Sequence, residues 1–256
     1  MTSIDVGALV LFLATGVAAG LVGCFALMRR MTLAADALSH VALPGIGLAI
    51  VLRINPLLGG VAMLLLGALL VWGLERKTRI ATETVIGVVF STALAAGSML
   101  TSGEQLIEAL FGGAGRTSAI EVAVGLAVAA CVVTFLLRER HRLVLAIVSP
   151  DIARTSGIDV SRLDLRFLLV FGLTIALGLR YLGVLLTGSL AIIPAATAKR
   201  LAGNLHAMLL VAVTVAVVTA GVGSSIAAVL HREPGPIVVL CAAACFFASL
   251  LVPRRV

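Results

Sequence analysis

The sequence predicts an all-α, polytopic membrane protein with eight to nine transmembrane helices. First, 61% of the 256 residues are hydrophobic and only 12% are charged, which is more apolar surface than a soluble domain buries. Second, apolar runs of roughly 20 residues, the length that a helix needs to cross the hydrocarbon core, recur along the whole chain. Third, the Lys and Arg residues form short clusters between those runs, as in cytoplasmic loops.

The charge and cysteine patterns exclude other classes of protein. The net charge of +7 does not indicate a nucleic-acid partner, because the basic residues are divided among clusters that report membrane orientation. The first five residues contain no Lys or Arg, so we expect the first apolar run to be retained and not cleaved as a signal peptide. All four cysteines lie in apolar runs, which disfavours a disulfide framework.

Placing every basic cluster on the cytoplasmic side threads the apolar runs in alternating directions and leaves the C-terminus inside. The clusters are Arg29 and Arg30, residues 75–79, residues 138–142 with Arg154, Arg162 and Arg166, Lys199 and Arg200, and Arg254 and Arg255. The first run crosses inward, and each later run reverses the direction. The expected single spans are residues 6–27, 33–52, 57–74, 84–100, 118–137, 205–230 and 237–252.

Residues 167–198 must leave and re-enter the membrane within about 32 residues, which is short for two crossings of roughly 20 residues each. We therefore expect one half to be tilted, broken or re-entrant, and this uncertainty gives the count of eight or nine. The outer segment before residue 118 carries Glu104 and Glu108, which could gather cations or simply form a solvated helix face.

The whole chain, residues 1–256, reads as one transmembrane domain with a cytoplasmic loop at about residues 138–166. Within that loop, Ser149 or Pro150 is placed to begin a short helix, Asp151 complements its amino end and Gly157 is placed to stop it. Such a helix could bind a cytoplasmic partner, or the segment could be only a solvated connection.

Asp36, His40 and Pro44 are spaced i, i+4, i+8 inside an apolar run, so on a helix they lie along one face. Ionisable groups at membrane depth normally face the bundle interior or a wet pathway. Proline lacks the N–H that would bond the carbonyl four residues earlier, and that carbonyl belongs to His40. A carboxylate, an imidazole and a freed carbonyl suit Zn²⁺, Mn²⁺ or Fe²⁺ better than Cu⁺.

Alternative interpretations remain at this point. Asp36 could merely hydrogen-bond His40 or a neighbouring helix and so hold the bundle together. Pro194 frees the carbonyl of Leu190, which predicts a helix kink that lines a cavity or serves packing alone. The chain contains no P-loop motif, so we expect no nucleotide site of that type. It also lacks the nucleophile elbow and the H-E-x-x-H pattern, which disfavours an intramembrane enzyme.

Four segments resemble the metal-ion permeases of bacterial ABC importers, the ABC-3 family of zinc-uptake and manganese-uptake permeases. They are "RRMTLAADALSHVALPGIGLAI", "SPDIARTSGIDVSRLD", "YLGVLLTGSLAIIPAATAKR" and "EPGPIVVLCAA". They occur in the family's order and cover nearly the whole chain.

The resemblance implies a homodimer of permeases in the bacterial inner membrane. It also implies a separate cytoplasmic ATPase, which hydrolyses ATP, and an extracytoplasmic metal-binding protein that delivers the cation. The D-x-x-x-H match implies that Asp36 and His40 are transient ligands of a transported metal, with zinc favoured over manganese or iron and with no permanently bound cofactor. The match implies that the expected short helix around residues 149–157 is a candidate coupling helix for the ATPase, comprising Ser149, Pro150, Asp151, Ile152, Ala153 and Gly157.

A competing hypothesis is a self-contained, ion-coupled secondary transporter in which Asp36 carries a proton. It would need no ATPase and no docking helix. Metal uptake by this chain alone, driven by a proton gradient without ATP, would favour it over the ABC importer.

Overall fold

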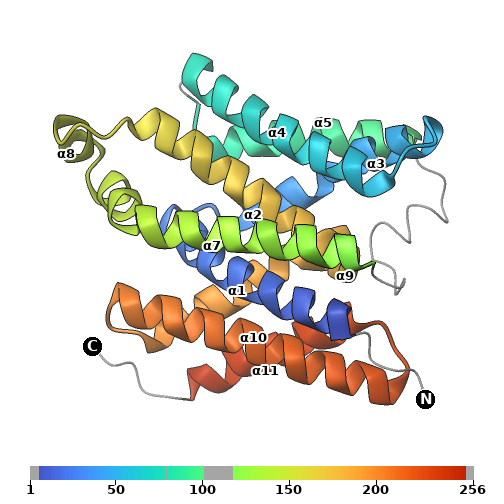
Figure 1. The fold of residues 1–256 in the computed structure, drawn as a ribbon. Helices are drawn as coiled ribbons and strands as arrows, with labels where there is room; N and C mark the ends of the chain where they lie inside the picture. The colour runs from blue at the N-terminus through green and yellow to red at the C-terminus, as the bar shows by residue number, and fades with distance from the viewer. Residues whose placement is uncertain (1–5, 79, 101–117, 252–256) are drawn as a thin grey trace.

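The computed structural model describes residues 6–78, 80–100 and 118–251, and its described residues form ten helices and no strands. Figure 1 shows them as one bundle in which most helices run roughly side by side. The helices are α1 (Val6–Met28), α2 (Thr32–His40), α3 (Ala42–Val51), α4 (Pro56–Thr78), α5 (Thr82–Leu100), α7 (Ala119–Val148), α8 (Pro150–Thr155), α9 (Val160–Leu201), α10 (Leu205–Leu230) and α11 (Pro234–Leu250). The all-α class is confirmed.

Five of these helices are long and apolar enough to cross a membrane. They are α1, α4, α5, α7 and α10, and the shorter apolar segments Asp36–Val51 and Pro234–Leu250 add to them. Together with the long helix α9, these segments agree with eight to nine crossings.

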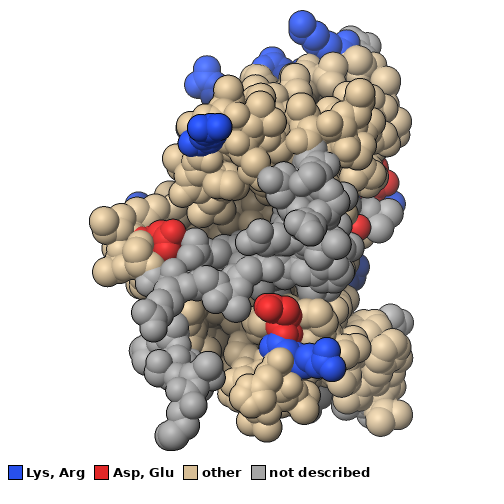
Figure 2. Space-filling view, turned by 90° about the vertical axis from the view of Figure 1, so that its right-hand side faces the viewer, with Lys and Arg blue, Asp and Glu red and all other residues tan. Residues whose placement is uncertain are grey.

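The ends of the helices alternate as the basic clusters predict. α1, α4, α7 and α11 end at the left of Figure 1, where α5, α9 and α10 begin. Arg76 and Lys77 lie in the last turn of α4, and Lys199 and Arg200 lie in the last turn of α9. On the opposite end, Figure 2 shows Lys, Arg, Asp and Glu side chains spread over the face and not gathered into one patch. We call the left-hand end the cytoplasmic end.

α9 reverses direction within its length. In Figure 1 both of its ends lie at the cytoplasmic end, and its middle lies at the opposite end. A Cβ placed on Gly178 would meet the side-chain Cγ2 of Thr187 at 2.5 Å, although nine residues of straight helix would separate them by about 13 Å. The expected re-entry within residues 167–198 is therefore present. Helix continues through Pro194, which is buried.

α1 lies at the centre of the bundle, and 67% of its apolar window is buried compared with 22% for α7. Small residues allow this close packing. A Cβ on Gly20 would meet the carbonyl oxygen of Ala212 in α10 at 3.0 Å, and a Cβ on Gly23 would overlap the carbonyl of Ala191 in the returning half of α9. The core beside them contains the buried ring of Phe25.

α7 extends further than the hydropathy pattern predicts. The apolar run ends near residue 137, whereas the helix continues through the basic cluster to Val148. Thirty residues span about 45 Å, longer than the hydrocarbon core of about 30 Å. Arg and Glu are good helix formers, so the last turns continue beyond the membrane and position α8.

Candidate functional site

The site predicted at Asp36, His40 and Pro44 lies where one membrane segment is divided into two helices. α2 ends at His40, Val41 forms a turn, and α3 begins at Ala42. The Val41 N–H donates to the carbonyl of Leu38 at 3.0 Å. This bond spans three residues, whereas an α-helical bond spans four, so the turn is tighter than an α-helix. Pro44, in the first turn of α3, has no N–H for the carbonyl of His40. The break thus lies directly beside the two ionisable side chains.

The two side chains differ in their surroundings. His40 is half-buried, and its Nδ1 is buried with no hydrogen-bond partner among the described residues. Its ring lies against Phe90 of α5, with centroids 5.4 Å apart at an interplanar angle of 60°. Asp36, one turn earlier, is exposed on the surface of the single chain. A buried nitrogen and an exposed carboxylate on one helix face can together approach a cation from one side.

Ser39 lies between them and is not part of this pair. It is buried, and its hydroxyl donates to the main-chain carbonyl of Asp36 at 2.6 Å. The hydroxyl is therefore satisfied within its own helix turn, and it turns away from the face that carries Asp36 and His40.

Glycines hold the neighbouring helices against this break. Gly45 in α3 and Gly59 in α4 pack backbone to backbone, and a Cβ on either would overlap the carbonyl oxygen of the other. Gly97 in α5 packs on Leu43 and Pro44, with the Pro44 nitrogen 3.1 Å from its Cβ position. α4 and α5 thus fix the position of α3, because glycines allow their backbones to approach closely.

A single chain does not supply a closed metal site within its described residues. No group of three or more His, Cys, Asp or Glu side chains comes together there. Glu104 and Glu108, which could gather cations on the outer side, lie outside the described residues. Two side chains and a main-chain carbonyl would make only an open site, in which water or a second molecule would have to complete the coordination of a metal ion.

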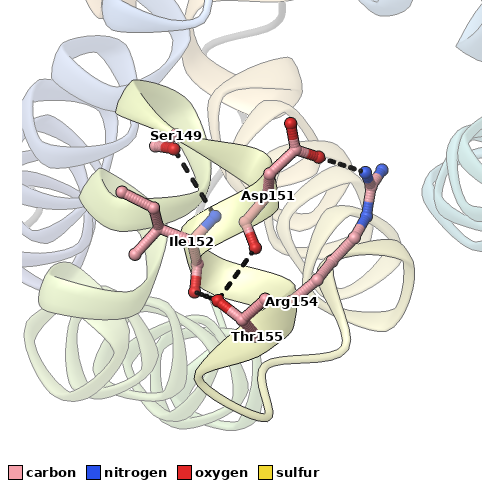
Figure 3. Close-up of polar contacts among 5 residues, drawn as sticks. All are labelled: Ser149, Asp151, Ile152, Arg154 and Thr155. Carbon is pink, nitrogen blue, oxygen red and sulfur yellow. Dashed lines mark hydrogen bonds and ion pairs between the residues drawn. The ribbon is translucent and has the colours of Figure 1, made fainter.

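The second predicted feature is the short cytoplasmic helix, and the structure contains it as α8. Figure 3 shows its polar contacts. The Ser149 hydroxyl accepts a bond from the Ile152 N–H at 3.5 Å, and Arg154 pairs with Asp151 at 3.0 Å. Only Ala153 of this helix is fully buried, which fixes α8 on the bundle, whereas Ile152 is 56% exposed.

Gly157 ends the helix turn as predicted, because its φ of +79° lies in the left-handed region. Its N–H donates to the carbonyl of Arg154 at 3.0 Å, and the next N–H, of Ile158, donates to Ala153 at 3.0 Å. The acceptors are the main-chain carbonyls of Arg154 and Ala153, so these two bonds satisfy carbonyl groups in the last turn of α8. α8 therefore has a fixed shape and an exposed surface at the cytoplasmic end.

Two contacts that the sequence does not predict anchor the segment after α8. Arg29, at the end of α1, forms an ion pair with Asp164 at 2.6 Å and lies 4.5 Å above the ring of Phe167. The indole N–H of Trp72, in α4, donates to the carbonyl of Ser161 at 2.9 Å. Arg29 is visible in the sequence only as part of a basic cluster, and nothing local pairs it with Asp164.

The sequence matches the ABC 3 transport family over residues 2–253. It is 31% identical over 256 residues to the high-affinity zinc uptake system membrane protein ZnuB of Haemophilus influenzae, covering 95% of this chain and 97% of that protein. It is 31% identical over 254 residues to the manganese import system permease protein ScaB of Streptococcus parasanguinis, covering 97% and 90%.

Among solved structures, the fold resembles a chain of PsaBC from Streptococcus pneumoniae in complex with Fab. The TM-score is 0.83 with 27% sequence identity, and the match covers 96% of this chain and 90% of that chain. The likeness extends over the bundle as a whole and is not limited to the site.

Proposed function

This chain belongs to the ABC 3 transport family, and from that premise we propose that it is the permease subunit of an ATP-driven importer of divalent transition-metal ions. It is a multi-pass protein of the bacterial inner membrane. Its role is to form the translocation path, while ATP hydrolysis belongs to a separate subunit. The relatives that support this role are named for zinc uptake and manganese import.

One observation supports the cation step most strongly: the buried Nδ1 of His40 has no hydrogen-bond partner within residues 6–78, 80–100 and 118–251, and Asp36 lies one helical turn away. An unsatisfied polar atom at membrane depth is costly. A passing metal ion would satisfy that nitrogen and balance the carboxylate. Because the site is open, the ion would be bound loosely enough to leave, as a transport pathway requires.

We propose zinc as the first substrate, with manganese and iron as the alternatives. Imidazole nitrogen is a common zinc ligand, but the pair of imidazole and carboxylate does not separate neighbouring divalent ions. The equal identity to a zinc relative and a manganese relative does not separate them either.

We also propose three partners. A second copy of the chain would cover Asp36, which is otherwise exposed on the outside of a membrane helix. A cytoplasmic ATPase would seat α8, whose exposed surface lies at the cytoplasmic end. An extracytoplasmic metal-binding protein would deliver the cation at the opposite end.

Metal-specific rescue tests this function. The chain, expressed with its ATPase and delivery protein in a strain that lacks its own importers, should restore growth on limiting zinc and the uptake of radioactive zinc. Rescue by manganese or iron alone would reassign the substrate. Uptake by the chain alone in ATP-free vesicles under a proton gradient would contradict the proposal in favour of a secondary transporter with Asp36 as the proton carrier.

A further inference from the structure

A pocket of about 450 Å³ opens at the cytoplasmic end of the bundle, between α4 and the start of α9. This volume lies within the range of roughly 300–1,000 Å³ found for small-molecule sites. The pocket is separate from the Asp36 and His40 site. Several of its lining residues, from Asp159 to Arg166, come soon after α8 in the sequence. Its polar lining residues are Trp72, Arg76, Asp159, Ser161, Arg162 and Arg166.

The lining has an excess of positive charge. Asp159 is the only carboxylate among the described residues that line it, and it pairs with Arg162 at 3.0 Å. Arg76 and Arg166 form no ion pair among the described residues, and the guanidinium of Arg76 lies 4.9 Å from the centroid of the Trp72 ring. Two guanidinium groups are thus available to an anion, and their planar donors match a phosphate group.

The pocket also contains an uncharged hydrogen-bond donor, the Ser161 hydroxyl, and a hydrogen bond that joins its two sides. The hydroxyl oxygen of Ser161 is buried and has no hydrogen-bond partner within the described part of the chain. The bond from the Trp72 indole to the Ser161 carbonyl holds the two walls together at 2.9 Å. A ligand with acceptor oxygens would satisfy the free hydroxyl without moving either helix.

An apolar stripe on α4 leads from the membrane to this pocket. Leu69 lies one turn before Trp72 and two turns before Arg76, and it is 47% exposed. Leu66 and Leu70 beside it are exposed as well. Tryptophan is enriched at the membrane interface, so the pocket lies where a lipid headgroup meets its acyl chains.

We propose that this pocket binds the phosphate headgroup of an anionic phospholipid from the cytoplasmic leaflet, with its acyl chains along the exposed leucines of α4. Basic pockets between transmembrane helices on this side of a membrane bind such headgroups. The lipid would contact both α4 and the start of α9, and so would reduce the motion of the segment next to α8.

Native mass spectrometry of the full-length chain in mild detergent tests this proposal. Phosphatidylglycerol should bind to the wild-type chain more tightly than phosphatidylcholine. Arg76→Gln and Arg166→Gln should each weaken phosphatidylglycerol binding about fivefold, and the two together about 25-fold. The matched control is Arg138→Gln with Arg142→Gln, which removes the same charge from α7 and should leave binding unchanged. Arg166→Lys, which keeps the charge, should bind between wild type and Arg166→Gln.

Equal phosphatidylglycerol binding by the pocket and control variants would overturn the proposal. So would full displacement of the lipid by free glycerol phosphate at equal concentration, since that result would assign the site to a soluble phosphate. Loss of ATPase association in the pocket variants with unchanged lipid binding would assign the arginines to the protein partner instead. Because lipid binding needs no metal, its failure would leave the transport function untouched.

Discussion

α8 and α2 are both short helices with polar side chains, but they satisfy those groups in opposite ways. In α8, which lies in water, Ser149, Asp151 and Thr155 all form local hydrogen bonds. In α2, which lies at membrane depth, the Nδ1 of His40 has no partner among the described residues and Asp36 is exposed.

The polar groups of the two helices therefore serve different purposes: those of α8 fix the shape of a helix, and those of α2 are available to a ligand. Water could satisfy every group of α8, so its internal bonds add little energy and serve to fix its shape. The bilayer cannot satisfy those of α2, so an imidazole nitrogen without a partner among the described residues is consistent with the proposed transient binding of a cation. The local bonds of α8 therefore fit its proposed role in docking the ATPase, and the unsatisfied groups of α2 fit their proposed role in binding the cation.

The largest expected effect comes from removing the free groups of α2. Asp36→Asn and His40→Ala should each reduce uptake of radioactive metal to background, because each removes one of the two side chains that we propose as ligands of the cation. Membrane insertion and ATPase association should not change. Uptake is measured in cells that contain equal amounts of each variant in their membranes.

Ser39→Ala is the matched control for these two variants. Its hydroxyl bonds the carbonyl of Asp36 within the same helix, so its loss should leave most of the uptake. Normal uptake by Asp36→Asn and His40→Ala would remove both residues from the pathway and make α2 a packing element like its neighbours.

The next effect concerns the contact that holds α3 beside this pair. Gly45→Ala should destabilise the protein by about 1–3 kcal/mol, because the new Cβ meets the Gly59 carbonyl and the Met63 Cβ. Gly73→Ala in α4, where the Cβ has open space, should stabilise it by roughly 0.5–1 kcal/mol. Thermal unfolding in detergent measures both effects. Equal unfolding midpoints for the two variants would show that α4 can move away from α3 without loss of stability.

The shape of α8 can be changed without touching its charged groups. Gly157→Val forces a β-branched residue to a φ of +79°, at a cost of roughly 1–2 kcal/mol, which corresponds to about tenfold weaker docking of the ATPase. Gly203→Val, at an exposed glycine with open space, is the control. Unchanged co-purification of the ATPase with Gly157→Val would count against α8 as the coupling helix.

The smallest effect is expected for the surface ion pair of α8. Arg154→Gln removes the bond to Asp151, but the two side chains are 65% and 91% exposed, and exposed pairs contribute little. ATPase binding should change less than twofold in the same assay. A loss as large as that of Gly157→Val would mean that Arg154 contacts the ATPase directly.

The sequence predicts those features of this fold that depend on neighbouring residues. Apolar runs and basic clusters predict the spans and their orientation, because insertion is governed by local hydropathy and charge. The start and end of α8 follow from Ser149, Pro150 and Gly157, whose capping preferences act over a few residues.

Features that depend on contacts between distant residues could not be predicted in the same way. The length of residues 167–198 predicts a reversal in α9, but only packing places it between Gly178 and Thr187. The pairs of Arg29 with Asp164 and Trp72 with Ser161 join helices far apart in the chain, and no local pattern marks them. Whether Pro194 kinks α9 stays a prediction, as do the roles of Asp36 and His40.

The packing of Gly23 against Ala191 has a consequence for how the protein is made. α1 is synthesised first, but its close partner in the returning half of α9 emerges about 170 residues later. At 5–20 residues per second, α1 waits roughly 10–30 s for that partner. During this interval the Gly23 face of α1 is open to the lipid or to the insertion machinery, so the most buried of the five long apolar helices completes its packing late.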